Sequence, residues 1–547
     1  MSVVLGINGA FHDPAAALVV DGSVVAATEE ARIGRSVPGA GVVPAATWEL
    51  PIEAVRWSID AAGLDPTAID AIAYCYDPDL LGPRHDADLS RDGWDDLRSP
   101  PPARAPRFLA AAIPALATVP CFQVPHHIAH AASAHAASPF GSSATMVVGG
   151  RGERTSYLAG HARQGHLEVL AHARLPNSLG LVFEDLAAHL GHRRRADEHK
   201  VLALAASGVP RHLDRLRDLV RSDGRGGFST ARIRWSDLCP RGAGDGTLDR
   251  AHADLAASVQ ARLEEVLLDL AWWLHDETGE EALTLAGSIA LNWVANSRLH
   301  EDGPFRDVWV QPAAGDGGTA LGAAYHVAVE LGDEPRPMCS ASLGRGWTDD
   351  AIEAELRRAG LAYHRAGDVA ADAARLLADD ALVGWFQGRS EFGPRALGHR
   401  SLLAHPGRPA NADRLQQVTG RARSQPVGPM VLEERAPELF DRGPLPSPFM
   451  LFTHHVRPTW RDRMPAAVEA DDTTRARTVS EAADPLVHRL LRSFEGLTGL
   501  PLVAGTSLDT PHRPVVDTPG DAIECLRSAP IDALVLGPWI VRRGLGR

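Results

Sequence analysis

The chain has 547 residues, of which 45% are hydrophobic and 23% are charged, and this composition is ordinary for a soluble globular protein. At roughly 150 residues per domain, the length predicts about three or four compact units. The formal net charge of −14 argues against a binder of duplex nucleic acid and against a membrane anchor built from basic residues.

The sequence gives no sign of a membrane span or of a secretory leader. No apolar run approaches the roughly 18 residues that a membrane span needs. The first residues lack the basic and apolar regions of a signal peptide. The five cysteines are scattered and form no Cys-x-x-Cys pair, which is typical of reduced thiols. We therefore expect a cytoplasmic protein.

The first 74 residues predict a sheet with one helix. Apolar runs at 3–8, 15–20 and 23–27 read as strands, and Asp21-Gly22 reads as the turn between the last two. Apolar residues then recur at helical spacing over 51–62, and a buried strand follows at 70–74. This β-β-β-α-β order is typical of ribonuclease-H-like folds that bind ATP.

The pattern of strands and helices continues along the rest of the chain. Strands are expected at 121–124, 144–148, 157–160, 283–287 and 308–311, and helices at 126–137, 179–190, 201–207, 251–278 and 320–329. A helix at 350–359 and a strand at 383–386 begin a new region. We predict an N-terminal domain over 1–335, a linker over 336–349 and a C-terminal domain over 350–547.

One candidate metal site lies at the start of a predicted helix. His126 and His130 are four residues apart, so both imidazoles project from one helix face and could chelate one metal ion. The alternative is a histidine-rich helix end at a domain surface. Asp316, at a strand-to-helix junction, is either a further metal ligand or an N-cap, which is the commoner use of such an aspartate.

Two further positions suggest catalytic side chains. His12 and Asp13 directly follow the first strand, where a histidine beside a carboxylate is a candidate general base or a structural residue. Lys200 is the only lysine of the chain, which suggests a specific need for a compact ammonium group. Its neighbours form a charge run, which is more often a solvated loop.

Glycine-rich segments carry the candidate anion sites. The segment 287–292, which ends at Asn292, follows a predicted strand and suits either a nucleotide or a tight turn. The segment 393–400 offers the guanidinium groups of Arg395 and Arg400 to a phosphate or carboxylate. The alternative for the second segment is an arginine-rich surface turn held by salt bridges.

Taken in order, these motifs resemble the O-carbamoyltransferases of antibiotic and nodulation pathways. The resemblance rests on segments from residue 1 to about 545, namely 11–13, 126–134, 177–180, 287–292, Asp316 and 393–403. It implies an α/β protein whose N-terminal domain is a duplicated ribonuclease-H-like, actin-like unit related to threonylcarbamoyl-transfer proteins. The implied C-terminal domain is an α/β unit like threonylcarbamoyl-adenylate synthase.

The resemblance also implies an activity and roles for individual residues. The C-terminal domain of this family makes carbamoyl-adenylate from carbamoyl phosphate and ATP, and the N-terminal domain passes the carbamoyl group to a hydroxyl at an iron-type metal site. His126, His130 and Asp316 then correspond to metal ligands, and His12 to the residue that activates the acceptor. Arg395 corresponds to a phosphate contact, and Lys200 to the lysine of a Gly-Lys-Leu segment.

The sequence departs from the family pattern at several site positions. Gly149 replaces a metal-ligand aspartate, which would weaken a divalent-metal site. Thr419 and Gln425 stand where cations should bind carbamoyl phosphate, and Gly505 replaces an asparagine. A charge-assisted hydrogen bond to an anion is worth roughly 1.5–3 kcal/mol, so two lost cations would weaken binding by a factor of about a hundred or more.

These departures favour an enzyme of antibiotic biosynthesis that no longer transfers carbamoyl groups. We expect leaving-group chemistry, such as aziridine ring closure with loss of sulfate or phosphate from a small antibiotic precursor, in a cleft between the two domains. The expected catalytic residues are His12, Asp13 and Lys200, and the expected substrate or anion contacts are Arg395, Arg400, Arg421, Asn292 and His127.

Two alternatives remain open. The first is an O-carbamoyltransferase that uses ATP, carbamoyl phosphate and iron or another divalent metal. The second is a non-catalytic scaffold for a small partner protein. A cofactor is expected only if carbamoyl transfer is retained, and no nucleic acid or membrane is expected as a partner.

Overall fold

A computed structural model describes residues 2–34, 50–80, 104–194, 197–244, 247–421, 427–511 and 513–544. The described chain forms two compact units, and the second of them begins at Cys339. Within the described residues, no helix is both long enough and apolar enough to cross a membrane.

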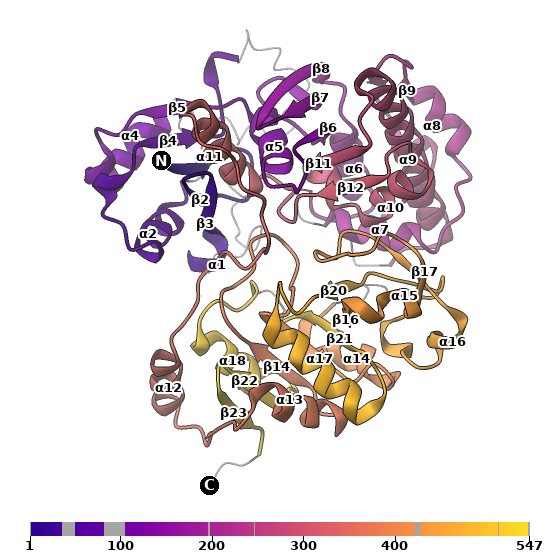
Figure 1. Ribbon diagram of the computed structural model, residues 1–547. Coiled ribbons are helices and arrows are strands. Elements are labelled where there is room, and N and C mark those ends of the chain that lie inside the picture. Colours follow the sequence, from indigo (N-terminus) through magenta and orange to yellow (C-terminus); the bar gives the residue numbers. More distant parts are fainter. Residues whose placement is uncertain are drawn as a thin grey trace. The chain divides into compact units, whose positions relative to one another are not determined.

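The first unit contains two five-stranded sheets with the same strand order (Figure 1). In the first sheet, β1 (Val3–Asn8), β2 (Ala15–Val20) and β3 (Ser23–Glu29) are antiparallel, and β4 (Ala71–Tyr74) and β5 (Cys121–Gln123) continue it in parallel on the other side of β1. In the second sheet, β6 (Ser142–Val148), β7 (Thr155–Arg163) and β8 (His166–Arg174) take the antiparallel places, and β11 (Ala282–Ala286) and β12 (Asp307–Val310) the parallel ones. The predicted duplicated ribonuclease-H-like unit is confirmed.

Helices α5 (His126–His135) and α11 (Gly318–Glu330) form the core between these two sheets. Helix α11 packs against β1 and β2 of the first sheet, α5 packs against β6 and β11 of the second, and the two helices pack against each other. Buried alanines on α5, and buried alanines and glycines on α11, permit a close approach. The N-terminal ends of both helices carry candidate metal ligands.

The remaining helices of the first unit are α1 (Glu30–Gly34), α2 (Ile52–Ala61), α4 (Ala105–Ala112), α6 (Leu179–His189), α7 (Glu198–Ala205), α8 (Leu213–Leu219), α9 (Arg250–Thr278) and α10 (Trp293–Asp302). A short hairpin, β9 (Val220–Ser222) and β10 (Phe228–Thr230), accompanies them. Helix α9 is the long amphipathic helix that the sequence predicts. It begins at a capping box on Asp249 and ends at Gly279, which adopts the left-handed conformation.

The second unit is built on a mixed eight-stranded sheet, and the predicted α/β class is confirmed. In spatial order its strands are β13 (His364–Arg365), β23 (Trp539–Arg542), β22 (Ala533–Leu536), β14 (Val383–Phe386), β15 (Arg400–Ala404), β21 (Leu502–Ser507), β16 (Gly428–Leu432) and β20 (Arg477–Val479). A small second sheet holds β17 (Phe440–Arg442), β18 (His454–Val456) and β19 (Thr473–Thr474). The central strands β14, β15, β21 and β22 are buried along nearly their whole length, as expected of strands covered on both faces.

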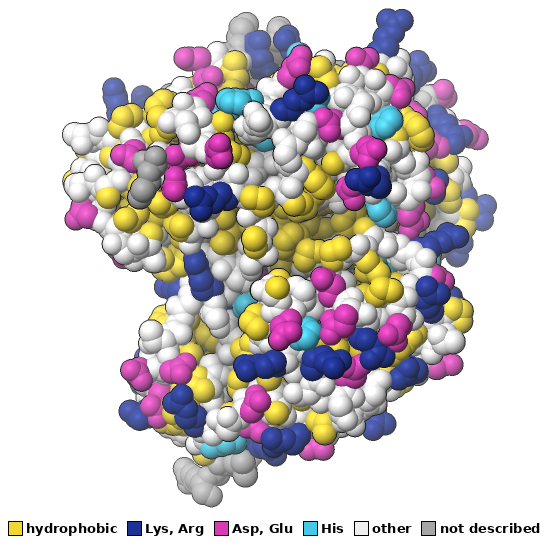
Figure 2. Space-filling view, in the orientation of Figure 1, with side chains coloured by type: hydrophobic (Ala, Val, Ile, Leu, Met, Phe, Trp, Pro, Cys, Tyr) yellow, Lys and Arg dark blue, Asp and Glu magenta, His cyan; other side chains and the backbone are white. Residues whose placement is uncertain are grey.

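The helices of the second unit are α12 (Asp349–Arg358), α13 (Val369–Ala378), α14 (Ala410–Thr419), α15 (Ala436–Leu439), α16 (Pro458–Arg461), α17 (Pro485–Thr498) and α18 (Pro519–Ser528). Figure 2 shows acidic and basic side chains interspersed over the face of this unit that it presents. Ion pairs within this unit include Arg492 with Glu495 and Arg435 with Glu438.

The segment expected as a linker, 336–349, is divided between the two units. Met338 donates its backbone N–H to the carbonyl of Ala137 in the first unit. From Cys339 onward the chain belongs to the second unit, where Gly344 donates to the carbonyl of Ser390 and the Trp347 indole donates to the carbonyl of Asp517 at 2.9 Å.

The close packing of α5 on α11 predicts a specific sensitivity at Gly322. A methyl group at this position of α11 would overlap the backbone carbonyl of Ala129 on α5. We expect Gly322→Ala to lower the free energy of unfolding by about 3 kcal/mol, because neither backbone can give way. The measurement is the unfolding transition of the first unit in scanning calorimetry.

Gly496 provides the matched control for this substitution. It lies within α17, and a Cβ atom there would have no neighbour within 4 Å. Gly496→Ala should therefore stabilise the second unit by about 0.5–1 kcal/mol through helix propensity alone. Equal unfolding temperatures for Gly322→Ala and the unchanged protein would contradict the close approach of the two helices.

Candidate functional site

The turn after β1 brings His12 and Asp13 into a fixed geometry. The buried Asn8 side chain donates to the carbonyl oxygens of His12 and Asp13, both at 2.8 Å. Phe11 and Asp13 have positive φ angles of 61° and 51°, a region that non-glycine residues seldom adopt. Such strain is common at functional sites and is held here by the Asn8 hydrogen bonds. The result is a His12 Nδ1 atom 2.9 Å from Asp13 Oδ2.

A single buried carboxylate, Asp316, joins three histidines. Its Oδ1 lies 3.6 Å from Nε2 of His126 and 3.4 Å from Nε2 of His130, one helical turn apart on α5. Its Oδ2 lies 3.4 Å from Nε2 of His12. The structure therefore brings together four of the predicted site residues, from the turn after β1, from α5 and from the turn that precedes α11. We call His12, His126, His130 and Asp316 the histidine–aspartate cluster.

Burial and charge oppose each other within this cluster. Desolvation disfavours a charged His12, but the carboxylates of Asp316 and Asp13 outweigh it and raise its pKa to about 9. Burial likewise opposes protonation of His126, and Asp316 nevertheless holds its pKa well above the usual value. Burial lowers the pKa of His130 to about 4, although Asp316 acts in the opposite direction. His12 and His126 keep the pKa of Asp316 well below its usual value despite its burial.

The donor set of the cluster fits a divalent transition metal. One atom each from His126, His130 and Asp316 lies within 4.8 Å of the others, and all three residues are buried. The Nε2 atom of His126 makes no hydrogen bond within the described part of the chain, as expected of an atom that serves as a ligand. Two imidazoles and one carboxylate suit iron, zinc or a similar ion, and three protein ligands leave coordination positions open.

His127 and Gly149 lie beside these ligands. His127 is only 2% exposed, and its Nδ1 is 2.9 Å from the hydroxyl of Thr155. Its Nε2 makes no hydrogen bond to any described residue. A Cβ atom built on Gly149 would lie 3.5 Å from this Nε2. Burial, together with His126 and His130, holds the pKa of His127 well below its usual value, and the carbonyl of Ser156 acts weakly against them.

Glu153 is a positioning residue to which the sequence analysis gives no role. Its Oε1 accepts hydrogen bonds from the backbone N–H of His126 and of Asp77, both at 2.9 Å. It thus satisfies the first free N–H of α5 and places a negative charge at that helix's N-terminus. A glutamate shortly after a glycine-rich turn is too common a pattern to reveal this role in the sequence.

Two predicted site residues have other partners. The Lys200 ammonium group lies on α7, 3.1 Å from Asp197, and its side chain is 41% exposed. Asn292 caps α10 by accepting from the N–H of Ala295 at 3.0 Å, and its amide donates to Gln260 at 2.8 Å. Both polar atoms of the Asn292 side chain therefore form hydrogen bonds within the protein, where the sequence predicts a substrate contact.

In the second unit, Arg395, Arg421 and Arg475 line one pocket, which we call the arginine pocket. Strands β16 and β21 contribute part of its wall, including Gly428 and Gly505. The guanidinium of Arg421 donates to the hydroxyls of Thr506 at 3.1 Å and Ser507 at 2.6 Å, which orients it along the pocket wall.

Neighbouring positive charge disfavours the charged forms of Arg395 and Arg475. Burial lowers the pKa of Arg395 well below its usual value, and the positive charges of Arg475 and Arg421 lower it further. Burial and Arg421 also lower the pKa of Arg475 to about 10, against the favourable charge of Glu469. Convergent guanidinium groups of this kind favour an anion, because it relieves their mutual repulsion. Arg475 is absent from the predicted set. It lies between β19 and β20, and its sequence neighbours form none of the motifs singled out in the sequence.

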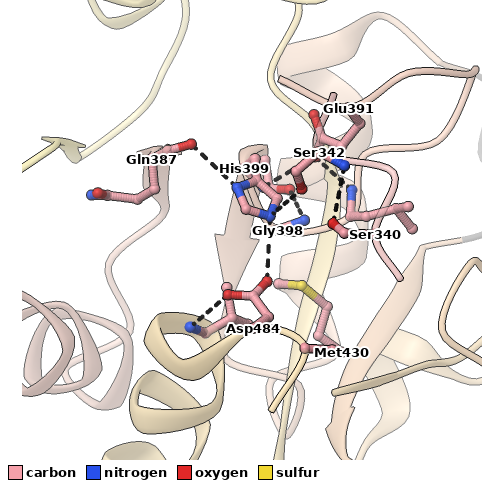
Figure 3. Close-up of polar contacts among 12 residues, drawn as sticks. Ser340, Ser342, Gln387, Glu391, Gly398, His399, Met430 and Asp484 are labelled. Atoms are coloured by element: carbon pink, nitrogen blue, oxygen red, sulfur yellow. Dashed lines mark hydrogen bonds and ion pairs between the residues drawn. The ribbon is translucent and has the colours of Figure 1, made fainter. Parts of the chain in front are cut away.

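A buried glutamate shapes the loop that carries Arg395. Glu391 is 1% exposed, and its Oε1 accepts from the backbone N–H of Leu397 at 2.7 Å and of His399 at 3.0 Å. Figure 3 shows the His399 ring held in turn between Ser342 and Asp484. Its Nε2 lies 2.8 Å from the Ser342 hydroxyl and 3.4 Å from the Asp484 carboxylate. These contacts fix the segment 393–400 against β15 and α17.

Arg400 is placed differently from the anion contact that the sequence suggests. It is fully buried, and it donates to the carbonyl oxygens of Gln387 at 2.7 Å and Arg345 at 2.8 Å. Its guanidinium carbon lies 3.7 Å from the centre of the Phe386 ring. Arg400 therefore has a structural role. Its guanidinium N–H groups donate to backbone carbonyls and not to a substrate anion.

The replaced positions lie in and beside the arginine pocket. Gly505 lines it directly, and Thr419 ends α14 with its hydroxyl 3.2 Å from the carbonyl of Leu415. Neither supplies a positive charge. Gln425, the other expected loss, lies outside the described residues.

Comparison with known proteins gives a consistent result over both units. The family model described as carbamoyltransferase N-terminus matches residues 112–325, and the one described as carbamoyltransferase C-terminus matches residues 374–543. An uncharacterised Synechocystis protein, sll1178, is 32% identical over 99% of this chain and 97% of its own length. The nodulation protein NolNO of Sinorhizobium fredii is 33% identical, with 98% of this chain and 80% of that protein aligned.

A shorter alignment agrees with these matches. The nodulation protein NolO of Bradyrhizobium diazoefficiens is 36% identical over 76% of this chain and 78% of its own length. The chain therefore belongs to the carbamoyltransferase family.

Proposed function

We propose that this protein is an O-carbamoyltransferase that uses carbamoyl phosphate and ATP to carbamoylate a hydroxyl group of a small molecule. The observation that carries this proposal is the convergence of three arginines on one pocket within the carbamoyltransferase C-terminal region. The histidine–aspartate cluster in the other unit supports it, because it offers a metal-ligand set beside a histidine–carboxylate pair. This proposal replaces aziridine formation as the leading hypothesis, since family membership favours carbamoyl transfer.

The arginine pocket would perform the activation step. Guanidinium groups hold phosphoryl oxygens through paired, charge-assisted hydrogen bonds. In a balanced reaction, water and carbamoyl phosphate give carbamate and orthophosphate. A carbamate oxygen then attacks the α-phosphorus of ATP, and pyrophosphate leaves as carbamoyl-adenylate forms. Arg395, Arg421 and Arg475 would neutralise the phosphate charge that accumulates through both steps.

The histidine–aspartate cluster would perform the transfer step. His126, His130 and Asp316 would hold the metal ion, which supplies Lewis acidity to the carbamoyl carbonyl and neutralises Asp316 when bound. With that carboxylate neutralised, the main electrostatic cause of the raised pKa of His12 is removed. His12, oriented by Asp13, is then placed to accept the proton of the acceptor hydroxyl as this oxygen bonds to the carbamoyl carbon and AMP leaves.

The activation step predicts a pyrophosphate signal that depends on both substrates. With ATP and carbamoyl phosphate present, the protein should release pyrophosphate, and with either one alone it should not. Arg395→Ala should lower this rate by about a hundredfold, because it removes a charge-assisted contact to phosphate. No release from folded protein would contradict the proposed function.

Arg475 predicts a separate effect on binding. Arg475→Ala should weaken the affinity for carbamoyl phosphate by a factor of about ten to a hundred in calorimetric titration. Arg492→Ala is the matched control, because this exposed arginine of α17 pairs with Glu495 and does not line the pocket. Equal losses in the two variants would show that net charge, and not the pocket, determines binding.

A second candidate function keeps the pocket and changes the chemistry. Gly149, Thr419 and Gly505 supply no charge at the positions where the family resemblance implies ligands or polar contacts. The arginine pocket could instead hold a sulfate or phosphate leaving group of an antibiotic precursor. An internal amine would form a C–N bond as the C–O bond breaks, the leaving group would take the bonding electrons, and a base would take the amine proton. Release of sulfate from a sulfated amine without pyrophosphate formation would favour this candidate.

A further inference from the structure

Gly149 differs from Gly150 and Gly152, the glycines that follow it beside His127. Its φ angle lies outside the left-handed region, so its backbone does not require glycine. A Cβ atom there would meet only Nε2 of His127 at 3.5 Å and the carbonyl of Ser156 at 4.0 Å. By contrast, a Cβ atom on Gly152 would lie 2.6 Å from Nδ1 of His127, and one on Gly150 would lie 2.9 Å from Glu184. Gly149 thus leaves room for a small group, whereas its neighbours do not.

The side chain that faces this room has an unused polar atom. His127 is 2% exposed, and its Nε2 makes no hydrogen bond within the described ranges of the chain. The Thr155 hydroxyl lies 2.9 Å from Nδ1, and we assign this hydroxyl as the donor, which places the ring proton on Nε2. The backbone carbonyl nearest to this space, that of Ser156, already accepts from the N–H of Gly149 at 2.9 Å. A buried N–H group without an acceptor is costly, so the room at Gly149 suits an oxygen atom that accepts a hydrogen bond.

His127, which faces this space, lies beside the candidate metal ligands. The His127 ring centre lies 5.7 Å from that of His126 and 6.1 Å from that of His130. A divalent ion held by His126, His130 and Asp316 carries an excess positive charge and has open coordination positions. An anionic oxygen group placed there would receive the His127 N–H on one side and face the metal ion on the other.

We propose that the space at Gly149 binds a carboxylate or similar small oxyanion of an exogenous ligand, which completes the metal site in place of a protein side chain. The acceptor substrate is one source of such a group, and a free anion is another. The inference depends on metal binding by the cluster and is independent of the proposed carbamoyl transfer. It accounts for the unused His127 Nε2 and for a glycine that no backbone constraint requires.

The test is a titration of the whole protein with Co²⁺, followed by the visible absorption of the bound ion, in excess sodium formate or in equal sodium chloride. Formate, as the smallest carboxylate, should tighten Co²⁺ binding by about tenfold or more in the unchanged protein. Gly149→Asp should bind Co²⁺ tightly in chloride, and formate should add little. His126→Ala should show no Co²⁺ spectrum in either salt, which ties the signal to the cluster.

A third variant tests the role of His127. His127→Ala should lose most of the formate effect, and circular dichroism should establish that the variant is folded. If it does not fold, the comparison of the unchanged protein with Gly149→Asp still decides the matter. Equal Co²⁺ affinity in formate and chloride, or a formate effect of the same size in Gly149→Asp, would overturn the inference. Formate binding and pyrophosphate release are separate signals, so failure of either one is distinguishable from failure of the other.

Discussion

The first unit depends on one buried negative charge. Asp316 is 6% exposed at the start of α11, where His12, His126 and His130 converge on its two oxygens. A buried carboxylate persists only where positive or hydrogen-bonding partners compensate for its lost hydration. The packing of α11 between β1 and α5 provides these partners, so the duplicated fold and the cluster require each other.

The second unit poses the opposite electrostatic problem. Arg395, Arg421 and Arg475 share one pocket, where Arg421 raises the cost of charging the other two and Arg475 that of charging Arg395. The fold tolerates this cost because Glu391 fixes the loop of Arg395 through backbone N–H groups, and because Thr506 and Ser507 orient Arg421. A phosphate-bearing substrate would relieve the repulsion. Each unit therefore concentrates buried charge at the place where chemistry is proposed.

Much of this arrangement can be predicted from the sequence. The periodic spacing of apolar residues predicts the strands and helices of both halves of the first unit. The four-residue spacing of His126 and His130 predicts that both side chains project from one face of α5. Arg395 and Arg400 lie in one glycine-rich segment, so the sequence alone cannot show which of them contacts an anion. In the structure Arg395 lines the pocket and Arg400 is fully buried. Arg475 and Glu153 were missed because their roles arise from contacts between distant segments. Asn292 is the opposite case. It belongs to a predicted site motif, but its side-chain oxygen caps a helix.

The central claim is that the arginine pocket still binds the carbamoyl donor although Thr419 and Gly505 supply no charge. The most direct measurement is a calorimetric titration of the whole protein with carbamoyl phosphate, with inorganic phosphate and sulfate as competitors. Our account predicts saturable binding at one site per chain, in which carbamoyl phosphate displaces both competitors. Binding of sulfate or phosphate without binding of carbamoyl phosphate, or no binding by the folded protein, would contradict it.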